Sequence, residues 1–168
     1  MQPSGRTAPR YDLVVDGVRI SIKTETTGKS ADPKFISITK LLTVERDPWT
    51  PESLIERTLK HLSEYDAILM LRAIWEGALI HYQLVEIPVA LLQQLATVQL
   101  QPVAQRAGMA GRVRISLTAT VCKDDGTRLF RVVFDATDGK CQIKNLDIRA
   151  CALLMEWDLH AGDAIRIF

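Results

Sequence analysis

Hydrophobic and polar residues alternate with a period of two through residues 11–25, which read YDLVVDGVRISIKTE. Asp16-Gly17 lies between two apolar runs, and an Asp-Gly pair in that setting is a strong signal for a two-residue hairpin turn. The alternation then separates an apolar face of the hairpin from a polar face. The apolar face holds Leu13, Ile20 and Ile22, and the polar face holds Asp12, Arg19, Ser21, Lys23 and Glu25.

The pattern that follows predicts further strands and two helices in the first half of the chain. Thr50, Pro51 and Glu52 supply a capping hydroxyl, a proline at the first helical position and an acid in the first turn. We expect that helix to run to about residue 64. The other expected elements are strands at residues 35–44, 66–74 and 79–87 and a second helix at residues 88–97.

The second half of the chain is expected to be rich in strands. Residues 99–111 read as an irregular link, and residues 112–135 as a long hairpin turning at Asp125-Gly126. Its apolar faces match when Val121 pairs with Phe130. A strand at residues 141–144 and a last helix at residues 145–157 complete the chain. This order of elements predicts an α/β, mixed α+β, fold class.

Composition narrows the class of protein. With 168 residues and 47% hydrophobic content, the chain can form one domain, residues 11–168, after a flexible tail at residues 1–10. A net charge of +1 argues against a non-specific DNA coat protein, so a nucleic-acid partner would need a local basic patch. Three cysteines without CxxC spacing indicate reduced thiols in a cytoplasmic protein. No apolar run is long enough for a membrane span, and the N-terminus does not read as a signal peptide.

The hairpin, with Asp12 on one strand and Ser21-Ile22-Lys23 on the other, resembles the PD-(D/E)xK nuclease superfamily, which includes type II restriction endonucleases. The segments ISIKTE, FISITKLL, DAILMLRAI and YQLVEIP extend the resemblance over residues 11–88. It implies a central mixed sheet flanked by helices, with a catalytic core at residues 11–98. Residues 99–168 would form a β-hairpin-rich part that recognises DNA.

The resemblance also implies a chemistry, namely Mg²⁺-dependent hydrolysis of phosphodiester bonds in double-stranded DNA by a homodimer. Asp12 would hold the metal ion, and the backbone carbonyl of Ile22 would be a further ligand. Lys23 would orient or deprotonate the attacking water and stabilise the developing charge.

The chain departs from the superfamily pattern in two places. The position two before Lys23 is usually acidic and is Ser21 here, so another residue must supply the second carboxylate. The candidates are Glu25, one pleat further along the strand, and Glu52 and Glu56 on the following helix. The superfamily also usually has a helix before the aspartate strand, which residues 1–10 cannot form. That helix is dispensable, is supplied by a partner, or precedes this chain in a longer protein.

Six cations are candidates for DNA contacts. Lys29, Lys34 and Lys40 would follow the DNA backbone near the site, and Arg112, Arg114 and Arg131 would act from a β-ribbon in a groove. Each of the six is also compatible with an ordinary solvated surface.

Four other interpretations stay open, each simpler than a nuclease active site. Acid and lysine on the hairpin could simply pair on a solvated strand face, and His81 favours a hydrogen-bonded sheet histidine over a base. The chain could also be a catalytically degenerate module that binds DNA or a protein partner, or a structural subunit of a larger enzyme.

Overall fold

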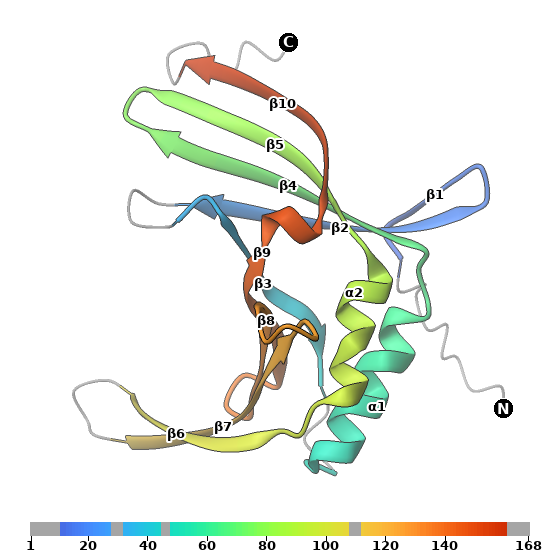
Figure 1. Cartoon of the computed structure of the whole chain (residues 1–168), viewed down its shortest axis with the longest axis vertical. Coiled ribbons are helices and arrows are strands. Elements are labelled where there is room, and N and C mark those ends of the chain that lie inside the picture. The colour runs from blue at the N-terminus through green and yellow to red at the C-terminus, as the bar shows by residue number, and fades with distance from the viewer. Residues whose placement is uncertain (1–10, 28–31, 45–47, 108–111, 161–168) are drawn as a thin grey trace, which may run out of the picture.

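The computed structural model describes residues 11–27, 32–44, 48–107 and 112–160. This part of the chain holds ten strands, two α-helices and two short 3₁₀ helices (Figure 1). Their bounds are β1 Leu13–Val15, β2 Val18–Thr27, β3 Phe35–Thr43, α1 Pro51–Leu62, β4 Ala67–Glu76, β5 Leu79–Ile87, α2 Val89–Gln93, η1 Gln94–Thr97, β6 Gln101–Ala107, β7 Arg112–Cys122, β8 Arg128–Asp135, β9 Lys140–Asp147, η2 Ile148–Ala150 and β10 Ala152–His160.

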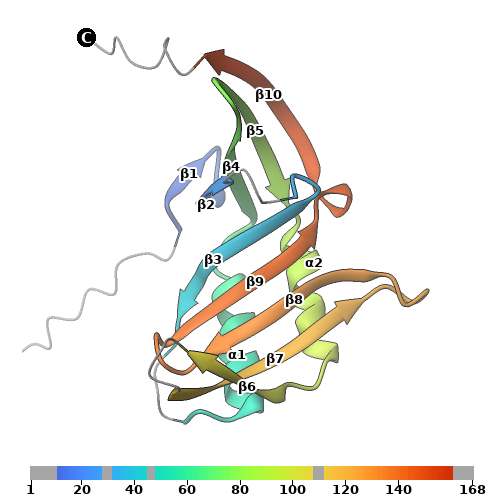
Figure 2. The ribbon, with the colours of Figure 1, turned by 90° about the vertical axis from the view of Figure 1, so that its left-hand side faces the viewer.

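The strands form two five-stranded sheets. Sheet A has the order β1-β2-β4-β5-β10 and is mixed, because β2 runs parallel to β4 while its other pairs are antiparallel. Sheet B is antiparallel, with the order β3-β9-β8-β7-β6. Figure 2 shows α1 and α2 behind sheet B, on one of its faces. The predicted mixed α+β class is confirmed.

The strands do not all join the central sheet that the sequence suggested. After the hairpin, β3 leaves sheet A and pairs with β9 at the edge of sheet B, where Phe35 lies opposite Asp147. β4 takes the place beside β2 instead, and Lys23 pairs with Met70. The two sheets are therefore joined through β3, which passes from one to the other beside β2 (Figure 1).

Features set by local sequence agree with the predictions. Asp16 and Gly17 both have positive φ, 49° and 84°, as a two-residue hairpin turn of this kind requires. Leu13 pairs with Ile20, which is the predicted register. Thr50 caps α1, since its hydroxyl oxygen accepts a hydrogen bond from the Ser53 amide at 3.3 Å. The predicted register of the β7–β8 hairpin, with Val121 opposite Phe130, is also confirmed.

The helix predicted at residues 145–157 is wrong. β9 continues to Asp147, whose carboxylate caps the single turn of η2 by accepting from the Arg149 amide at 3.0 Å. The chain then forms β10, which pairs with β5. Trp157 lies opposite Tyr82, and their rings stack with centroids 5.3 Å apart. Residues 155–160 alternate apolar and polar with a period of two, which fits this strand better than a helix.

The irregular link predicted at residues 99–111 is also wrong over most of its length. Residues Gln101–Ala107 form β6, which pairs with β7 at the edge of sheet B. Pro102 is tolerated there because an edge strand has a side on which a missing amide hydrogen breaks no ladder bond.

The buried core lies between the helices and the two sheets. It includes Leu54 and Leu62 of α1, Ile68 of β4, and Phe130 and Phe134 of β8.

The hairpin faces this core with its polar side. Ser21 is 1% exposed, Lys23 and Glu25 are half-buried, and Ile22 on the opposite side is 41% exposed. On the neighbouring β4, Arg72 is 0% exposed. Charged and polar groups therefore gather on the inner face of sheet A.

No helix in the described part of the chain is long and apolar enough to cross a membrane. Cys122, Cys141 and Cys151 are all free thiols. Burial raises the pKa of Cys141 to about 12 and that of Cys151 to about 11, so both thiols stay protonated near neutral pH and act as apolar packing groups.

Candidate active site

Asp12 is held against the second strand of the hairpin. Its amide donates to the Ile20 carbonyl at 2.8 Å, which extends the ladder one residue beyond β1. Its Oδ2 accepts from the Ser21 hydroxyl at 3.3 Å and from the Ile22 amide at 2.5 Å. The carboxylate thus lies where the hairpin register predicts. Asp12 is exposed, both bonds go to Oδ2, and no described residue donates to its Oδ1, so that oxygen can take a ligand.

Lys23 lies two residues further along β2, on the same face as Ser21. Burial lowers the pKa of its ammonium, the charge of Asp12 opposes that shift, and repulsion by Lys40 adds to it. Lys23 is therefore close enough to both groups to feel their charges. An amine with a lowered pKa gives up its proton more readily, which suits a group that exchanges protons with water.

Tyr65, which follows α1, is buried. Burial raises the pKa of its phenol, and the negative charge of Asp12 adds to that shift, so the ring is neutral. Its ring meets that of His61 edge to face, with centroids 5.2 Å apart. Within the described part of the chain the Tyr65 hydroxyl is buried without a hydrogen-bond partner. A neutral, buried side chain therefore lies near enough to Asp12 for the charge of that carboxylate to act on its phenol.

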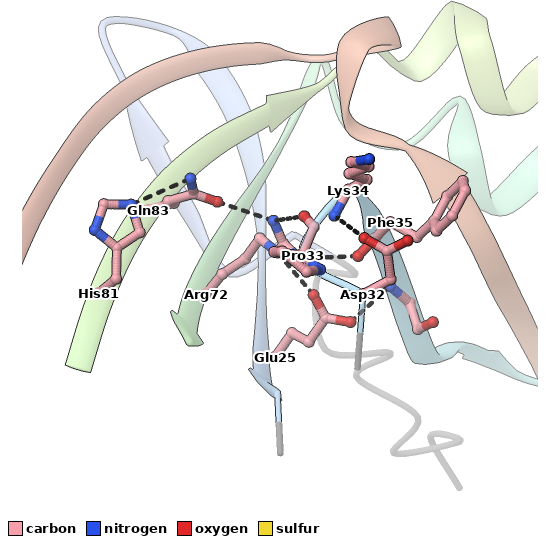
Figure 3. A network of polar contacts seen from close by, with 9 residues as sticks. Glu25, Asp32, Pro33, Lys34, Phe35, Arg72, His81 and Gln83 are labelled. Atoms are coloured by element: carbon pink, nitrogen blue, oxygen red, sulfur yellow. Dashed lines mark hydrogen bonds and ion pairs between the residues drawn. The ribbon is translucent and has the colours of Figure 1, made fainter. Parts of the chain in front are cut away.

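Glu25 and Arg72 form an ion pair on the inner face of sheet A (Figure 3). Arg72 Nε donates to Glu25 Oε2 at 2.8 Å, and the other carboxylate oxygen, Oε1, accepts from the Ser37 amide at 2.8 Å. The remaining guanidinium nitrogens donate to the carbonyls of Pro33 and Phe35, at 3.1 and 2.8 Å. Both oxygens of Glu25 are therefore engaged in tying β2 and β4 to the start of β3.

The same network continues across sheet A. Arg72 also donates to the side-chain oxygen of Gln83 at 2.9 Å, and the Gln83 amide nitrogen lies 3.3 Å from His81 Nε2 (Figure 3). On its other side, His81 Nδ1 lies 2.6 Å from a carboxylate oxygen of Asp158, and Nε2 lies 3.5 Å from one of Glu156. His81 is thus the hydrogen-bonded sheet histidine that the sequence favoured.

Sequence reasoning missed Arg72. The available signal was a single arginine in the apolar run DAILMLRAI, because a charge in a buried strand requires a partner of opposite charge.

Two of the other predicted metal ligands lie on α1. Glu52 and Glu56 lie exposed on α1. In residues 11–27, 32–44, 48–107 and 112–160, no three His, Cys, Asp or Glu side chains converge as a metal site. The choice of Glu25, Glu52 or Glu56 as the second acid therefore stays a prediction, and Asp12 is the carboxylate whose charge acts on Lys23.

The predicted DNA contacts are distributed over both sheets. Lys34 and Lys40 are exposed, just before β3 and on it. Arg131 is half-buried on β8, directly opposite Lys144 of β9. Lys29 lies outside the described residues, as does the predicted tail at residues 1–10. Arg112 and Arg114 belong to β7, but their side chains lie outside the description.

Comparison with known proteins shows which family the chain belongs to. The chain matches the SmaI family, described as type II site-specific deoxyribonuclease, over residues 3–159. It is 30% identical over 157 residues to the type II restriction enzyme SmaI of Serratia marcescens, an alignment that covers 91% of this chain and 61% of that enzyme. The chain thus spans about three fifths of the length of this relative. No solved structure matches the chain. The match over nearly the whole length shows that the chain belongs to the SmaI family of type II site-specific deoxyribonucleases.

Proposed function

We propose that this protein is a metal-dependent endonuclease of restriction-enzyme type that hydrolyses phosphodiester bonds in double-stranded DNA. We place it in the PD-(D/E)xK superfamily, as a variant with Ser21 at the second acid position. The observation that carries the proposal is the close placement of Asp12 and Lys23 on one hairpin, with burial lowering the pKa of the lysine. The family match supports the reaction class.

The oxygen atoms around Asp12 are of the kind that binds a magnesium ion. Asp12 offers an exposed carboxylate oxygen, a hard ligand of the kind that Mg²⁺ prefers, and the Ile22 carbonyl would be a second oxygen from the same strand pair. Protein sites commonly hold Mg²⁺ through only one or two carboxylates, with water and substrate phosphate completing the shell. When bound, the ion would offset charge on the phosphate and acidify water.

Lys23 would accept a proton from the attacking water. In its neutral form, the Lys23 amine accepts a proton as the water oxygen bonds to phosphorus and the bond to the leaving deoxyribose oxygen breaks. The leaving oxygen takes its proton from solvent. The lysine ammonium formed in this step then stabilises the negative charge on the phosphate oxygens. Ser21 contributes by donating a hydrogen bond to Asp12, which fixes the carboxylate in place.

Glu25 would act as a positioning residue. Its carboxylate pairs with Arg72 and accepts from the Ser37 amide, so it holds β3 beside β2. That contact determines where β3 lies, and β3 carries Lys40, whose charge acts on Lys23.

The part at residues 99–168 would recognise DNA. Arg131 and Lys144 lie directly opposite each other on β8 and β9. Like charges in that position destabilise a sheet, and an anion between them would relieve the repulsion. A DNA phosphate would supply such an anion.

We also propose that two copies of the chain form a homodimer, which would place one site on each strand of a palindromic duplex. The supporting feature is β10, one of the two edge strands of sheet A, where Leu153, Leu154 and Met155 are exposed. Sedimentation analysis should give a mass of two chains, and a monomer at micromolar concentration would contradict the idea. Three free cysteines support the expectation that the protein works in the cytoplasm.

The function is tested by incubating the protein with plasmid DNA and Mg²⁺. We expect cleavage that EDTA abolishes, and a loss of about 10²- to 10⁴-fold in rate for Lys23→Ala. Thr24→Ala changes an exposed side chain next to Lys23 on the opposite face of β2 and serves as the control. Equal cleavage by wild type and Lys23→Ala would overturn the mechanism. A protein that binds DNA but cuts none, with Mg²⁺ binding unaffected by Asp12→Asn, would be a binding module.

A further inference from the structure

β9 carries a bulge beside the first residues of β3. The register of the two strands shifts there, so that Lys144 and Asn145 of β9 lie opposite the single residue Ser37 of β3. Asn145 has a positive φ of 53°, a backbone conformation that asparagine tolerates better than most residues do. The residues on either side of this pair are fully buried in the core, whereas Lys144 is half-buried and Asn145 exposed, so both side chains point away from the core.

A second cation lies next to the bulge on the same face of sheet B. Arg131 of β8 is directly opposite Lys144, and its neighbours along the strand, Phe130 and Val132, are fully buried on the core side. Figure 2 looks onto the outward face of sheet B, with α1 and α2 behind the sheet. We call Arg131, Lys144 and Asn145 the bulge site. It lies on the side of sheet B that the helices do not cover.

The two cations of the bulge site have no partner of opposite charge among the described residues. No hydrogen bond or ion pair joins the side chain of Arg131, Lys144 or Asn145 to another residue in that part of the chain. Both cations are half-buried, and like charges directly opposite each other destabilise a sheet. The acid of β8 on the same face, Asp135, lies four residues from Arg131 and faces Lys140. Two cations and an amide with unused donors at one point therefore fit an anion.

Three acids of the chain lie outside the described residues, and none follows directly on the bulge site. Glu45 and Asp47 come after Val44, whose amide donates to the Gly139 carbonyl at 2.7 Å. Gly139 precedes β9, five residues before Lys144, which is about 16 Å along a strand. The chain thus enters residues 45–47 well away from the bulge. Asp163 comes after β10, which belongs to sheet A.

Ser37 connects the bulge site to the candidate active site. Its amide donates to Glu25 Oε1 at 2.8 Å, which holds this part of β3 against β2. Lys23 lies two residues before Glu25 on the same face of β2, about 7 Å away. On its other side, Ser37 is one strand spacing, about 4.8 Å, from the bulge in β9. Because Arg72 already pairs with Glu25, that carboxylate does not neutralise the bulge site, and a DNA strand at Lys23 could continue across β3 to it.

We propose that Arg131, Lys144 and Asn145 together bind one backbone phosphate of the DNA strand that is cut at Asp12 and Lys23. The Arg131 guanidinium and the Lys144 ammonium would donate to the phosphate oxygens, and the side-chain amide of Asn145 would donate a further hydrogen bond. This assignment rests on the proposed function and adds to it Asn145 and the path of the strand across β3. The contact would be sequence-independent and would position the strand relative to Lys23.

Asn145→Gly separates phosphate binding from a role in the bulge alone. Glycine adopts a positive φ readily, so this variant keeps the backbone of the bulge and loses the side-chain amide. Binding of a fluorescent duplex of random sequence is measured by anisotropy in EDTA over a series of salt concentrations. We expect the affinity of Asn145→Gly to fall about 3- to 10-fold. In Arg131→Gln with Lys144→Gln, the slope of log affinity against log salt should fall by about 0.9, because one phosphate contact is lost.

Lys60→Gln is the matched control for Lys144→Gln. It removes an exposed lysine of α1, on the side of sheet B that the helices cover, and should leave the affinity close to that of wild type. Thermal unfolding checks that the variants fold. The double variant should melt no lower than wild type, since it loses a contact between like charges, and Lys144→Gln alone replaces it if it does not fold. In plasmid cleavage with Mg²⁺, we expect the double variant to raise KM and keep kcat within a few fold, the opposite of Lys23→Ala.

The possible failures are distinguishable. Equal slopes for the double variant and wild type would overturn the bulge site while leaving the nuclease proposal intact. Equal losses of affinity in Lys144→Gln and Lys60→Gln would mean that only net charge matters, and wild-type affinity in Asn145→Gly would mean that Asn145 serves the bulge alone; either result contradicts the assignment. If wild type binds DNA with the expected changes in slope but cuts none, the bulge site stands and the nuclease proposal fails. If wild type neither binds nor cuts DNA, both fail.

Discussion

Replacing Glu25 separates its two possible roles, as a buried anchor and as a metal ligand. The Arg72 side chain is 0% exposed and that of Glu25 is 12% exposed, so their ion pair lies almost entirely inside the protein. Glu25→Ala would leave the guanidinium with neutral partners only, and would also remove the acceptor of the Ser37 amide. Removing one partner of a buried pair typically costs about 3–5 kcal/mol.

That cost is large compared with a typical folding free energy of about 5–15 kcal/mol. With an m-value of about 2 kcal/mol per molar urea, a loss of about 4 kcal/mol lowers the urea midpoint by about 2 M. The assay is urea unfolding followed by circular dichroism. Asp66→Ala is the matched control, because it breaks the exposed ion pair with Arg19 and should lower the midpoint far less.

A second variant tests the cause of the loss. Glu25→Gln with Arg72→Met removes both charges together, and we expect it to recover much of the stability lost in Glu25→Ala, since no unpaired charge remains buried. The reasoning is refuted if Glu25→Ala unfolds at the wild-type midpoint. If that variant also loses Mg²⁺-dependent cleavage, Glu25 is a metal ligand.

Two further predictions concern pH. Lys40→Gln removes a charge that lowers the pKa of Lys23, so the pKa of Lys23 should rise. The inflection that Lys23 causes in the plot of kcat against pH should then move to higher pH. An unchanged inflection would show that Lys23 does not accept the proton in the rate-limiting step. Asp66 accepts three hydrogen bonds from Arg19, which lower the pKa of its carboxyl to about 2. Because this pKa is depressed, the contribution of Asp66 to stability is present above its unfolded value of about 3.9 and is lost as the pH falls through about 2. The carboxyl carbon shift of Asp66 should titrate near 2 in wild type. In Arg19→Gln the midpoint should rise, although the retained backbone hydrogen bond from residue 19 keeps the pKa below its unperturbed value. A wild-type midpoint near the unperturbed value of about 4 would contradict the ion pair.

The sequence could predict the hairpin residues of the site but not its second carboxylate. Asp12, Ser21 and Lys23 are brought together by a single hairpin, whose register follows from its Asp16-Gly17 turn. Residues separated by a two-residue turn meet through local geometry, so their contact needs no knowledge of the rest of the fold. The second carboxylate could not be assigned in this way, because Glu25, Glu52 and Glu56 are positioned by contacts between elements far apart in the chain.

Elements with strong local signals were predicted and those with ambiguous signals were not. The cap of α1 at Thr50 and the register of β7 with β8 depend on residues a few positions apart. For residues 145–157, by contrast, an asparagine and an apolar run fit a helix start as well as a strand. Pairing with β5 decides between helix and strand, because residues 152–160 form the ladder of β10 along β5.

The sequence alone therefore determined the hairpin with Asp12 and Lys23, the strand-rich mixed fold class and the resemblance to nucleases. Only the tertiary structure decided which face of that hairpin points inward, that β3 joins sheet B, and that Glu25 is paired with Arg72. A period of two divides a strand into two faces but does not say which face other elements will cover. Ion pairs such as Glu25 with Arg72, 47 residues apart, form only because β2 and β4 become parallel neighbours in sheet A.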